Sequence, residues 1–159
     1  MRIGVGFDVH GFDESRRLVL GGVEILGSPG LAGHSDADVL CHAVADALLG
    51  AGKLGDLGGH FPATDQWRDA SSLDMLAETR ALLAAAGFGI ENVDSTIVAE
   101  QPRIGPYRLE MISNIAHALQ IPEGAVSIKA TTSDGLGFTG RGEGMAAYAV
   151  ALIDRLPSE

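Results

Sequence analysis

Residues 35–52 read SDADVLCHAVADALLGAG, and no other segment constrains the architecture as strongly. Leu, Val, Ala and Cys fill most positions, so a helix here is apolar on most sides and has to be buried. We expect Ser35 to cap its N-terminus and Gly50 or Gly52 to end it. The rest of the chain must therefore supply elements that cover this helix.

Strand, turn and helix patterns lie on both sides of this segment. We expect strands at residues 2–9, 17–20, 23–26, 93–99, 126–131 and 145–153, helices at 72–86 and 106–119, and glycine-rich loops at 54–68 and 132–144. This order predicts an α/β (α+β) fold, a two-layer sandwich with a mixed sheet of about four strands, a small hairpin, and helices on one face. Apolar residues on the other face imply burial against other subunits.

Composition excludes several classes of protein. The length of 159 residues fits one domain, residues 1–159. The net charge of −10 disfavours binding to nucleic acid or to an anionic membrane surface. No apolar run reaches the roughly 18–20 residues that a membrane span needs, and no signal-peptide pattern is present. Cys41 is the only cysteine, which fits a cytoplasmic protein.

The segment GVGFDVHGF (residues 4–12) places Asp8 two residues before His10. On a strand both side chains point to one face, where a carboxylate and an imidazole can bind one divalent metal. The alternative is a hydrogen-bonded polar pair without metal. Three glycines would let a backbone or a ligand approach closely: Gly4, Gly6 and Gly11.

Asp38, His42 and Asp46 share one face of the 35–52 helix, at a spacing of four residues. We predict His42 as the third metal ligand and Asp46 as the acceptor for its other ring N–H. Three protein ligands leave one position open, which is typical of catalytic zinc, and iron is the competing metal. The alternative is a solvated stripe on the outer helix face.

Two further segments offer phosphate-binding groups. His34 and Ser35 stand at a helix N-terminus, where free N–H groups favour anions, although a simple N-cap with an exposed histidine fits equally. Residues 129–144, KATTSDGLGFTGRGEG, add hydroxyls, Arg141 as a charged fork and Asp134 as a magnesium ligand. This segment lacks the Walker spacing.

Four segments together resemble a known family. They read GFDVHGF (6–12), HSDADVLCHAVADALLGA (34–51), GDLGGHFPATD (55–65) and KATTSDGLGFTGRGEG (129–144). In this order and at these distances they are similar to the 2-C-methyl-D-erythritol 2,4-cyclodiphosphate synthases of the non-mevalonate isoprenoid pathway. The resemblance covers nearly the whole chain.

The resemblance implies a reaction and an assembly. A phosphorus–oxygen lyase would convert 4-diphosphocytidyl-2-C-methyl-D-erythritol 2-phosphate to the 2,4-cyclodiphosphate and release CMP. It would work as a homotrimer, with sheets around the trimer axis and active sites at subunit interfaces. Each subunit would hold one Zn²⁺, and a Mg²⁺ or Mn²⁺ would bridge the substrate diphosphate.

The resemblance also implies residue roles. The zinc ligands would be Asp8, His10 and His42, and the catalytic residues His34 and Thr132. Contacts to the phosphate and methylerythritol would come from Asp8, His10, His34, Ser35, Asp56, Leu57, Gly58, Phe61, Pro62, Ala63, Thr64 and Asp65. Contacts to the cytidine and diphosphate would come from Ala99, Glu100, Gln101, Pro102, Arg103, Ile104, Gly105, Thr131, Thr132, Ser133, Asp134, Phe138 and Arg141.

Two positions depart from the family pattern. Asp134 stands where the family commonly has glutamate, so a bridging water can replace direct magnesium ligation. Ala63 stands where the loop usually carries aspartate, which removes one polar contact. Neither change affects the three predicted zinc ligands.

Two other functions remain as hypotheses. A zinc phosphoesterase would need a general base, and Asp38 and Asp46 are candidates. The same two residues could instead support the metal ligands or a second metal. A trimeric binding module would hold an isoprenoid diphosphate in a central cavity lined by the final strand and Phe7.

Overall fold

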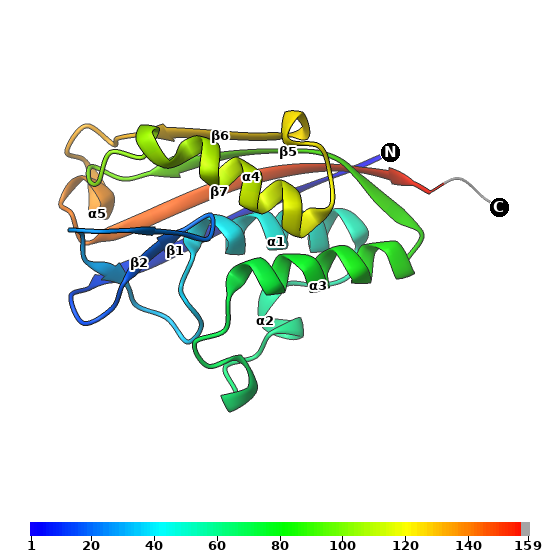
Figure 1. Ribbon diagram of the computed structural model, residues 1–159, viewed down its shortest axis with the longest axis horizontal. Helices are drawn as coiled ribbons and strands as arrows, with labels where there is room; N and C mark the ends of the chain where they lie inside the picture. The colour runs from blue at the N-terminus through cyan, green and yellow to red at the C-terminus, as the bar shows by residue number, and fades with distance from the viewer. Residues whose placement is uncertain (157–159) are drawn as a thin grey trace.

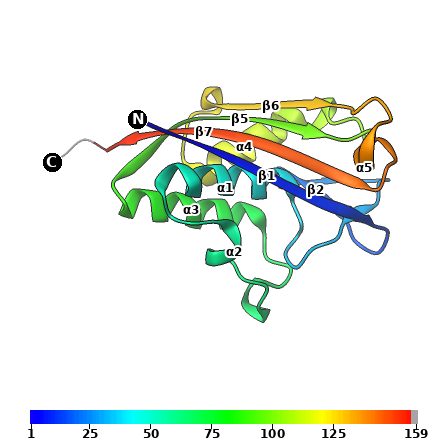
Figure 2. The same ribbon diagram turned by 180° about the vertical axis from the view of Figure 1, so that it is seen from behind.

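The computed structural model describes residues 1–156 and arranges them in a sheet layer and a helix layer (Figures 1 and 2). The predicted domain of residues 1–159 therefore includes a short end outside the described residues. The strands are β1 (Arg2–Asp13), β2 (Leu18–Leu20), β3 (Val23–Ile25), β4 (Gly30–Leu31), β5 (Phe88–Val98), β6 (Val126–Thr131) and β7 (Gly144–Arg155). The helices are α1 (Val39–Gly52), α2 (Leu57–His60), α3 (Ser72–Ala85), α4 (Arg108–Leu119) and α5 (Gly137–Gly140).

The sheet is mixed and has five strands in the order β4-β1-β7-β5-β6, and β2 and β3 form a separate hairpin. β5 and β6 run parallel, whereas the other neighbouring strands are antiparallel. The predicted mixed sheet with a small hairpin is thus confirmed, with the two-residue β4 as an additional edge strand.

Helix α1 forms the centre of the core. Twelve of its fourteen residues are buried, which confirms the burial expected from its apolar sequence. It packs directly on β1 at two glycines. A Cβ on Gly4 would stand 2.0 Å from Ala47 O, and a Cβ on Gly6 would stand 1.9 Å from Ala43 O. The two glycines therefore make room for the helix backbone itself.

Asp8 and His10 follow Gly4 and Gly6 along strand β1. Asp8 pairs with Ala147 of β7 and His10 pairs with Met145, so both lie in regular sheet. Because side chains alternate along a strand, Asp8 and His10 share the helix-facing side with Gly4 and Gly6. The predicted same-face arrangement of Asp8 and His10 is confirmed.

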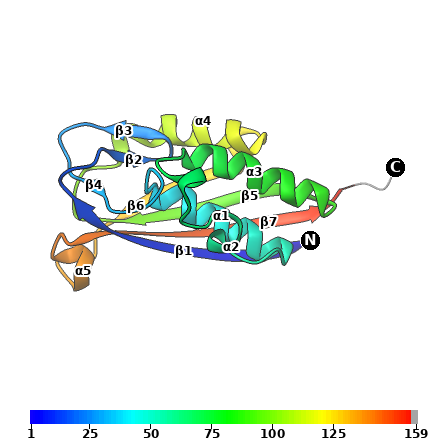
Figure 3. The same cartoon turned by 90° about the horizontal axis from the view of Figure 1, so that it is seen from below.

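The helices cover one face of the sheet. Figure 3 shows α1, α3 and α4 on the same side of β1, β5 and β7. On the opposite face the apolar side chains are exposed: Ile3, Val5, Phe7, Val9, Tyr148 and Val150. Within residues 1–156, none of the helices is long and apolar enough to cross a membrane.

The start of α1 differs from the prediction. Asp38, and not Ser35, is the N-cap, and its side chain accepts from Cys41 N at 3.1 Å. Ser35 lies further upstream because Ala37 has a φ of 57°, which is outside the helical region. Residues 35–37 therefore lie outside the regular helix.

Most other elements lie where the hydrophobic pattern indicates. The helix predicted at 72–86 ends one residue earlier, and the strand predicted at 126–131 has those bounds. The helix predicted from residue 106 begins as the 3-10 turn Gly105–Tyr107 before α4. The short helices α2 and α5 lie in the two predicted loops, because four residues carry too little periodicity to reveal a helix.

Candidate active site

Asp8, His10 and His42 converge where β1 meets α1. Asp8 Oδ2 lies 2.9 Å from His10 Nε2 and 3.0 Å from His42 Nδ1, and the two nitrogens are 3.2 Å apart. Ligands of a tetrahedral zinc ion, at bond lengths of 2.0–2.1 Å, stand about 3.3 Å from one another. The three atoms thus form a triangle of the size that one zinc ion needs, and the triad can hold a divalent metal.

The second nitrogen of each imidazole also fits metal binding. His10 Nδ1 lies 2.5 Å from Ala32 O, so this nitrogen carries the proton and donates it. His42 Nε2 faces the hydroxyls of Ser35 at 3.1 Å and Ser72 at 3.0 Å. A proton on each outer nitrogen leaves His10 Nε2 and His42 Nδ1 with lone pairs for the metal.

The charges of the triad reinforce one another. Burial raises the pKa of Asp8, but the close contacts and charges of His10 and His42 outweigh it, and the pKa lies well below its ordinary value. Burial lowers the pKa of His10, but the hydrogen bond and charge of Asp8 outweigh it and raise this pKa overall. Without metal, this raised pKa favours a proton on His10 beside the carboxylate of Asp8, in the place that a cation would take.

A cavity of about 200 Å³ opens beside the triad. His34 lies on its wall, and its Nε2 donates to Thr64 O at 2.6 Å. Ser35 is buried and accepts from Ala37 N at 3.2 Å. The wall also includes Leu57, Phe61, Ala63, Trp67 and Met75. The predicted zinc ligands and the predicted 2-phosphate residues thus line one cavity.

Several predicted methylerythritol contacts do not line this cavity. Asp56 caps α2 by accepting from Gly59 N at 2.9 Å. Asp65 pairs with Arg68 at 2.8 Å and is exposed. The predicted residues that do not line the cavity are Asp56, Gly58, Pro62, Thr64 and Asp65.

Asp46 differs from its prediction. Its Oδ1 accepts from Leu57 N at 2.7 Å and so fixes the start of α2. The outer nitrogen of His42 is met instead by Ser35 and Ser72. The spacing of four residues put Asp46 on the correct helix face, but one turn of helix separates it from the imidazole nitrogen that it was predicted to hold.

Asp38 has a structural role. It is fully buried, and its oxygens accept from Cys41 N at 3.1 Å and Gly22 N at 2.8 Å. Burial and the nearby charge of Asp36 raise the pKa of Asp38, while the backbone donors oppose that shift. Asp38 therefore caps α1 and fastens the β2–β3 hairpin to it, and is not placed as a base.

Eight of the thirteen predicted cytidine and diphosphate residues line a separate cavity of about 510 Å³. It lies between the chain after β5 and the end of β6. Its wall includes Ala99, Glu100, Pro102, Arg103, Ile104, Gly105, Thr131 and Thr132, and not the triad. A third cavity, of about 300 Å³, joins Gln101 and Pro102 to Arg141. The predicted site residues of one chain are therefore distributed over separate cavities, and the triad shares no cavity with the predicted cytidine and diphosphate residues.

Glu100 organises the loop after β6. Its Oε1 accepts from Ser133 N at 3.1 Å, from Ser133 Oγ at 3.2 Å and from Gly135 N at 3.3 Å. Thr132 Oγ1 donates to Asp134 Oδ1 at 3.1 Å, and Asp134 has a φ of 53°. The exposed Thr132 and Asp134 therefore sit on a loop whose shape depends on Glu100.

Arg141 and Phe138 lie on the surface near this loop. Arg141 Nε donates to Glu143 Oε1 at 2.7 Å, and this carboxylate raises the pKa of the guanidinium. Phe138 is 37% exposed. Both side chains are accessible to a ligand or to a second chain.

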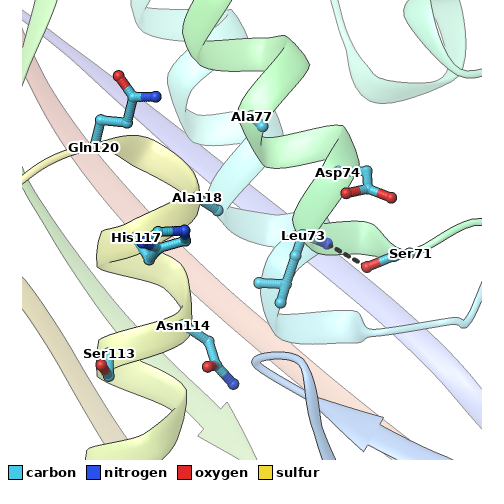
Figure 4. Close-up of a pocket in the computed structure, with 9 residues that line it drawn as sticks. All are labelled: Ser71, Leu73, Asp74, Ala77, Ser113, Asn114, His117, Ala118 and Gln120. Carbon is cyan, nitrogen blue, oxygen red and sulfur yellow. Dashed lines mark hydrogen bonds between the residues drawn. The ribbon is translucent and has the colours of Figure 1, made fainter.

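A further cavity, of about 520 Å³, lies between α3 and α4 (Figure 4). Asp74 comes from α3, and Asn114 and His117 come from α4. Asn114 Nδ2 is already used, because it donates to Gly21 O at 3.1 Å. None of the predicted site residues lines this cavity, so volume alone does not locate the chemistry.

Sequence reasoning did not find Asp36, Ser72 or Ala32 as partners of the triad. Ser72 lies 30 residues from His42, at the first residue of α3, where a serine is ordinary. Ala32 contributes only its carbonyl oxygen, which any residue would supply. No local spacing rule points to such contacts, because tertiary packing creates them.

Comparisons with known proteins agree with this geometry. A family model described as the YgbB family matches residues 1–154. A 2-C-methyl-D-erythritol 2,4-cyclodiphosphate synthase from Syntrophomonas wolfei is 56% identical over 156 residues, which cover 98% of this chain and 99% of that protein.

Solved structures have the same fold. The bifunctional IspDF from Campylobacter jejuni matches with a TM-score of 0.93 and 42% identity, over 98% of this chain and 42% of that one. IspF from Plasmodium falciparum, solved as a CDP complex, matches with a TM-score of 0.86 and 33% identity, over 98% of this chain and 97% of that one.

Proposed function

The chain belongs to the YgbB family, and from this premise we propose that it is a cyclodiphosphate synthase of the non-mevalonate isoprenoid pathway. It converts 4-diphosphocytidyl-2-C-methyl-D-erythritol 2-phosphate to 2-C-methyl-D-erythritol 2,4-cyclodiphosphate and CMP. The observation that carries the proposal is the Asp8–His10–His42 triad, which opens into the same cavity as His34 and Ser35.

The substrate supplies its own nucleophile. An oxygen of the 2-phosphate attacks the β-phosphorus, the bond from the β-phosphorus to the bridging oxygen breaks, and CMP leaves with that oxygen. Both reacting groups belong to one molecule, so the protein accelerates the step by holding them together and by neutralising charge. Cleavage of a phosphorus–oxygen bond without water makes the enzyme a phosphorus–oxygen lyase.

His34 and Ser35 hold the 2-phosphate end. Ser35 has a hydroxyl beside His42, and His34 lies on the cavity wall with its outer nitrogen fixed on Thr64 O. At the other end, Thr132 presents a hydroxyl and Arg141 a charged fork toward the diphosphate. These donors offset the repulsion between the substrate and a chain of net charge −10.

Asp8, His10 and His42 would hold Zn²⁺, because two imidazoles and one carboxylate suit this ion and its bond lengths. When bound, zinc supplies a Lewis acid that polarises a phosphate group, and a Mg²⁺ or Mn²⁺ near Asp134 supplies charge for the diphosphate. Asp134 already accepts from Thr132, so it would reach a second metal with its other oxygen.

The functional unit is a homotrimer with shared active sites. Two groups of site residues line different cavities of one chain, and the exposed apolar face of the sheet needs a partner. Phe7 and Tyr148, whose ring centroids are 4.7 Å apart on that face, would line a central cavity able to take an isoprenoid diphosphate. The free and buried Cys41 fits a reducing, cytoplasmic location.

Phosphorus NMR of the purified protein with the authentic cytidyl substrate tests the proposal. We expect the signals of a cyclic diphosphate and CMP, and loss of both products after chelation. A linear phosphate as the only product would replace the synthase with a phosphoesterase. The geometry does not favour that alternative, since Asp38 and Asp46 are both held by backbone donors.

A further inference from the structure

His42 has a second environment on the side away from Asp8 and His10. Its Nε2 lies 3.0 Å from Ser72 Oγ, and Ser72 is completely buried. Ser72 Oγ in turn donates to Asp36 Oδ1, and Asp36 Oδ2 accepts from Ser72 N at 2.8 Å. The carboxylate of Asp36 therefore holds both the backbone and the hydroxyl of Ser72.

The direction of these hydrogen bonds follows from the groups. A serine hydroxyl has one proton, and an ionised carboxylate can only accept. The Ser72 proton is therefore committed to Asp36, and Ser72 Oγ faces His42 as an acceptor. Only a protonated Nε2 satisfies that oxygen, and a neutral imidazole protonated at Nε2 has its lone pair on Nδ1, the atom that faces Asp8 and His10.

Ser35 is not equivalent to Ser72. Its hydroxyl also lies beside His42 Nε2, at 3.1 Å, and it accepts from Ala37 N. No carboxylate accepts from Ser35 among the hydrogen bonds of residues 1–156, so its proton is not committed in the same way. The donor direction of the Ser72 hydroxyl is therefore fixed, whereas that of the Ser35 hydroxyl is not.

Backbone contacts hold this pair in place. Asp36 N donates to Ala70 O at 3.0 Å, and Asp69 N donates to His34 O at 2.9 Å. The segment before α1 and the segment before α3 are therefore joined by several hydrogen bonds. Because of this junction, Ser72 is held at a fixed position behind the imidazole.

We propose that Asp36 and Ser72 are positioning residues for the His42 metal ligand: Ser72 accepts the Nε2 proton, Asp36 fixes the direction of that bond, and Nδ1 is left for the metal. This inference rests on the metal triad of the proposed function, but not on the identity of the substrate. Outer partners of this kind raise metal affinity by about 10- to 100-fold.

Zinc affinity, measured with zinc alone against a competing chromogenic chelator, tests the proposal in the full chain. We expect Ser72→Ala to weaken zinc binding by about 10- to 100-fold. Asp36→Asn is the sharper variant, because it keeps similar shape and hydrogen-bonding capacity. The amide has only one acceptor oxygen, so it cannot accept from both Ser72 N and Ser72 Oγ as the carboxylate does. Either the backbone of Ser72 or the direction of its hydroxyl is released, and zinc binding should weaken in the same range.

Ser71→Ala is the matched control. Ser71 caps α3 by accepting from Leu73 N at 3.3 Å (Figure 4) and does not contact His42 in the hydrogen-bond set of the described chain. It should lower the melting temperature and leave zinc affinity unchanged. The visible spectrum of the cobalt-substituted protein should change in Ser72→Ala and Asp36→Asn, and not in Ser71→Ala.

Zinc affinity within twofold of the wild type in both variants, with an unchanged cobalt spectrum, would overturn the positioning role. If Ser72→Ala does not fold, Asp36→Asn alone decides. The proposed function fails separately, if the wild-type chain binds zinc but forms no cyclic diphosphate.

Discussion

The cavity at the metal triad and the cavity between the chain after β5 and the end of β6 are built in opposite ways. The triad cavity lies where α1 packs backbone to backbone on β1, and its ligands come from two regular elements. The second cavity is lined by the chain after β5 and the end of β6, with mostly exposed side chains that include Arg103, Thr131 and Thr132. The first is complete within one chain, whereas the second is an open surface that a partner chain can close.

Folding of the monomer therefore forms the metal site, whereas assembly would complete the nucleotide site. The core that folds the monomer also sets the metal geometry, because Gly4 and Gly6 control how closely α1 approaches β1. The nucleotide end gains rigidity from local hydrogen bonds, among them those to Glu100, and, as proposed, from the trimer. Substitutions should therefore affect the two regions independently.

The largest effect is expected from the triad itself. His42→Ala removes one of three ligands and leaves Asp8 and His10 as a weak pair. Loss of a metal that stabilises charge by several kcal/mol lowers kcat/KM by about 1,000-fold or more. Elemental analysis and turnover of the purified variant measure this, and a variant that keeps zinc and full activity would contradict the ligand assignment.

Gly6→Ala should disturb the packing that forms the triad. Its Cβ would stand 1.9 Å from the backbone oxygen of Ala43, so helix and strand must separate, at a cost of about 1–3 kcal/mol. Zinc affinity should fall together with stability. Gly11→Ala in the same strand is the control, because its Cβ would lie 3.6 Å from Glu143 O, an ordinary contact. Equal unfolding free energies for both variants would argue against the packing account.

Glu100→Ala should weaken the other region alone. It removes the acceptor of three donors on the 133–135 loop, and we expect CMP binding to weaken about tenfold through loss of loop order. Calorimetry with CMP and, separately, with zinc distinguishes the two regions. A parallel loss of zinc affinity would show that they are coupled.

The pH dependence of metal binding should be the smallest effect over the neutral range. The pKa of His10 is raised, so this imidazole keeps its second proton up to a higher pH than an ordinary histidine does. Zinc must displace that proton in order to bind. Affinity should therefore fall as pH drops through that raised pKa, above 6.5, by at most about tenfold per pH unit for one proton. Proton release measured calorimetrically in two buffers checks this, and no release would contradict it.

The sequence predicted the parts of the site that follow from local periodicity. Asp8 and His10 share a strand face, and His42 faces them from a helix that had to be buried. The same rule misplaced Asp46, because helical spacing gives the face but not the height of a side chain along it. Ser72 and Asp36 were missed because Ser72 meets His42 only through the packing of α3 on α1, and Asp36 acts only through Ser72.

For the fold, strands and helices with strong patterns were predicted within a few residues. The two-residue β4 and the four-residue α2 and α5 were not, since tertiary contacts determine such short elements. Local sequence patterns also did not predict that the site residues line separate cavities. The exposed face of the sheet was expected, and with it the need for partner chains.

Subunit mixing tests most directly whether one chain supplies the metal end and its neighbour the nucleotide end. His42→Ala and Thr132→Ala, each inactive alone, are mixed, dissociated and reassembled. If sites form between subunits, random reassembly should restore about one quarter of wild-type activity, since that share of sites combines two intact ends. A mixture that stays inactive, with mixed oligomers demonstrated by mass spectrometry, would contradict the account.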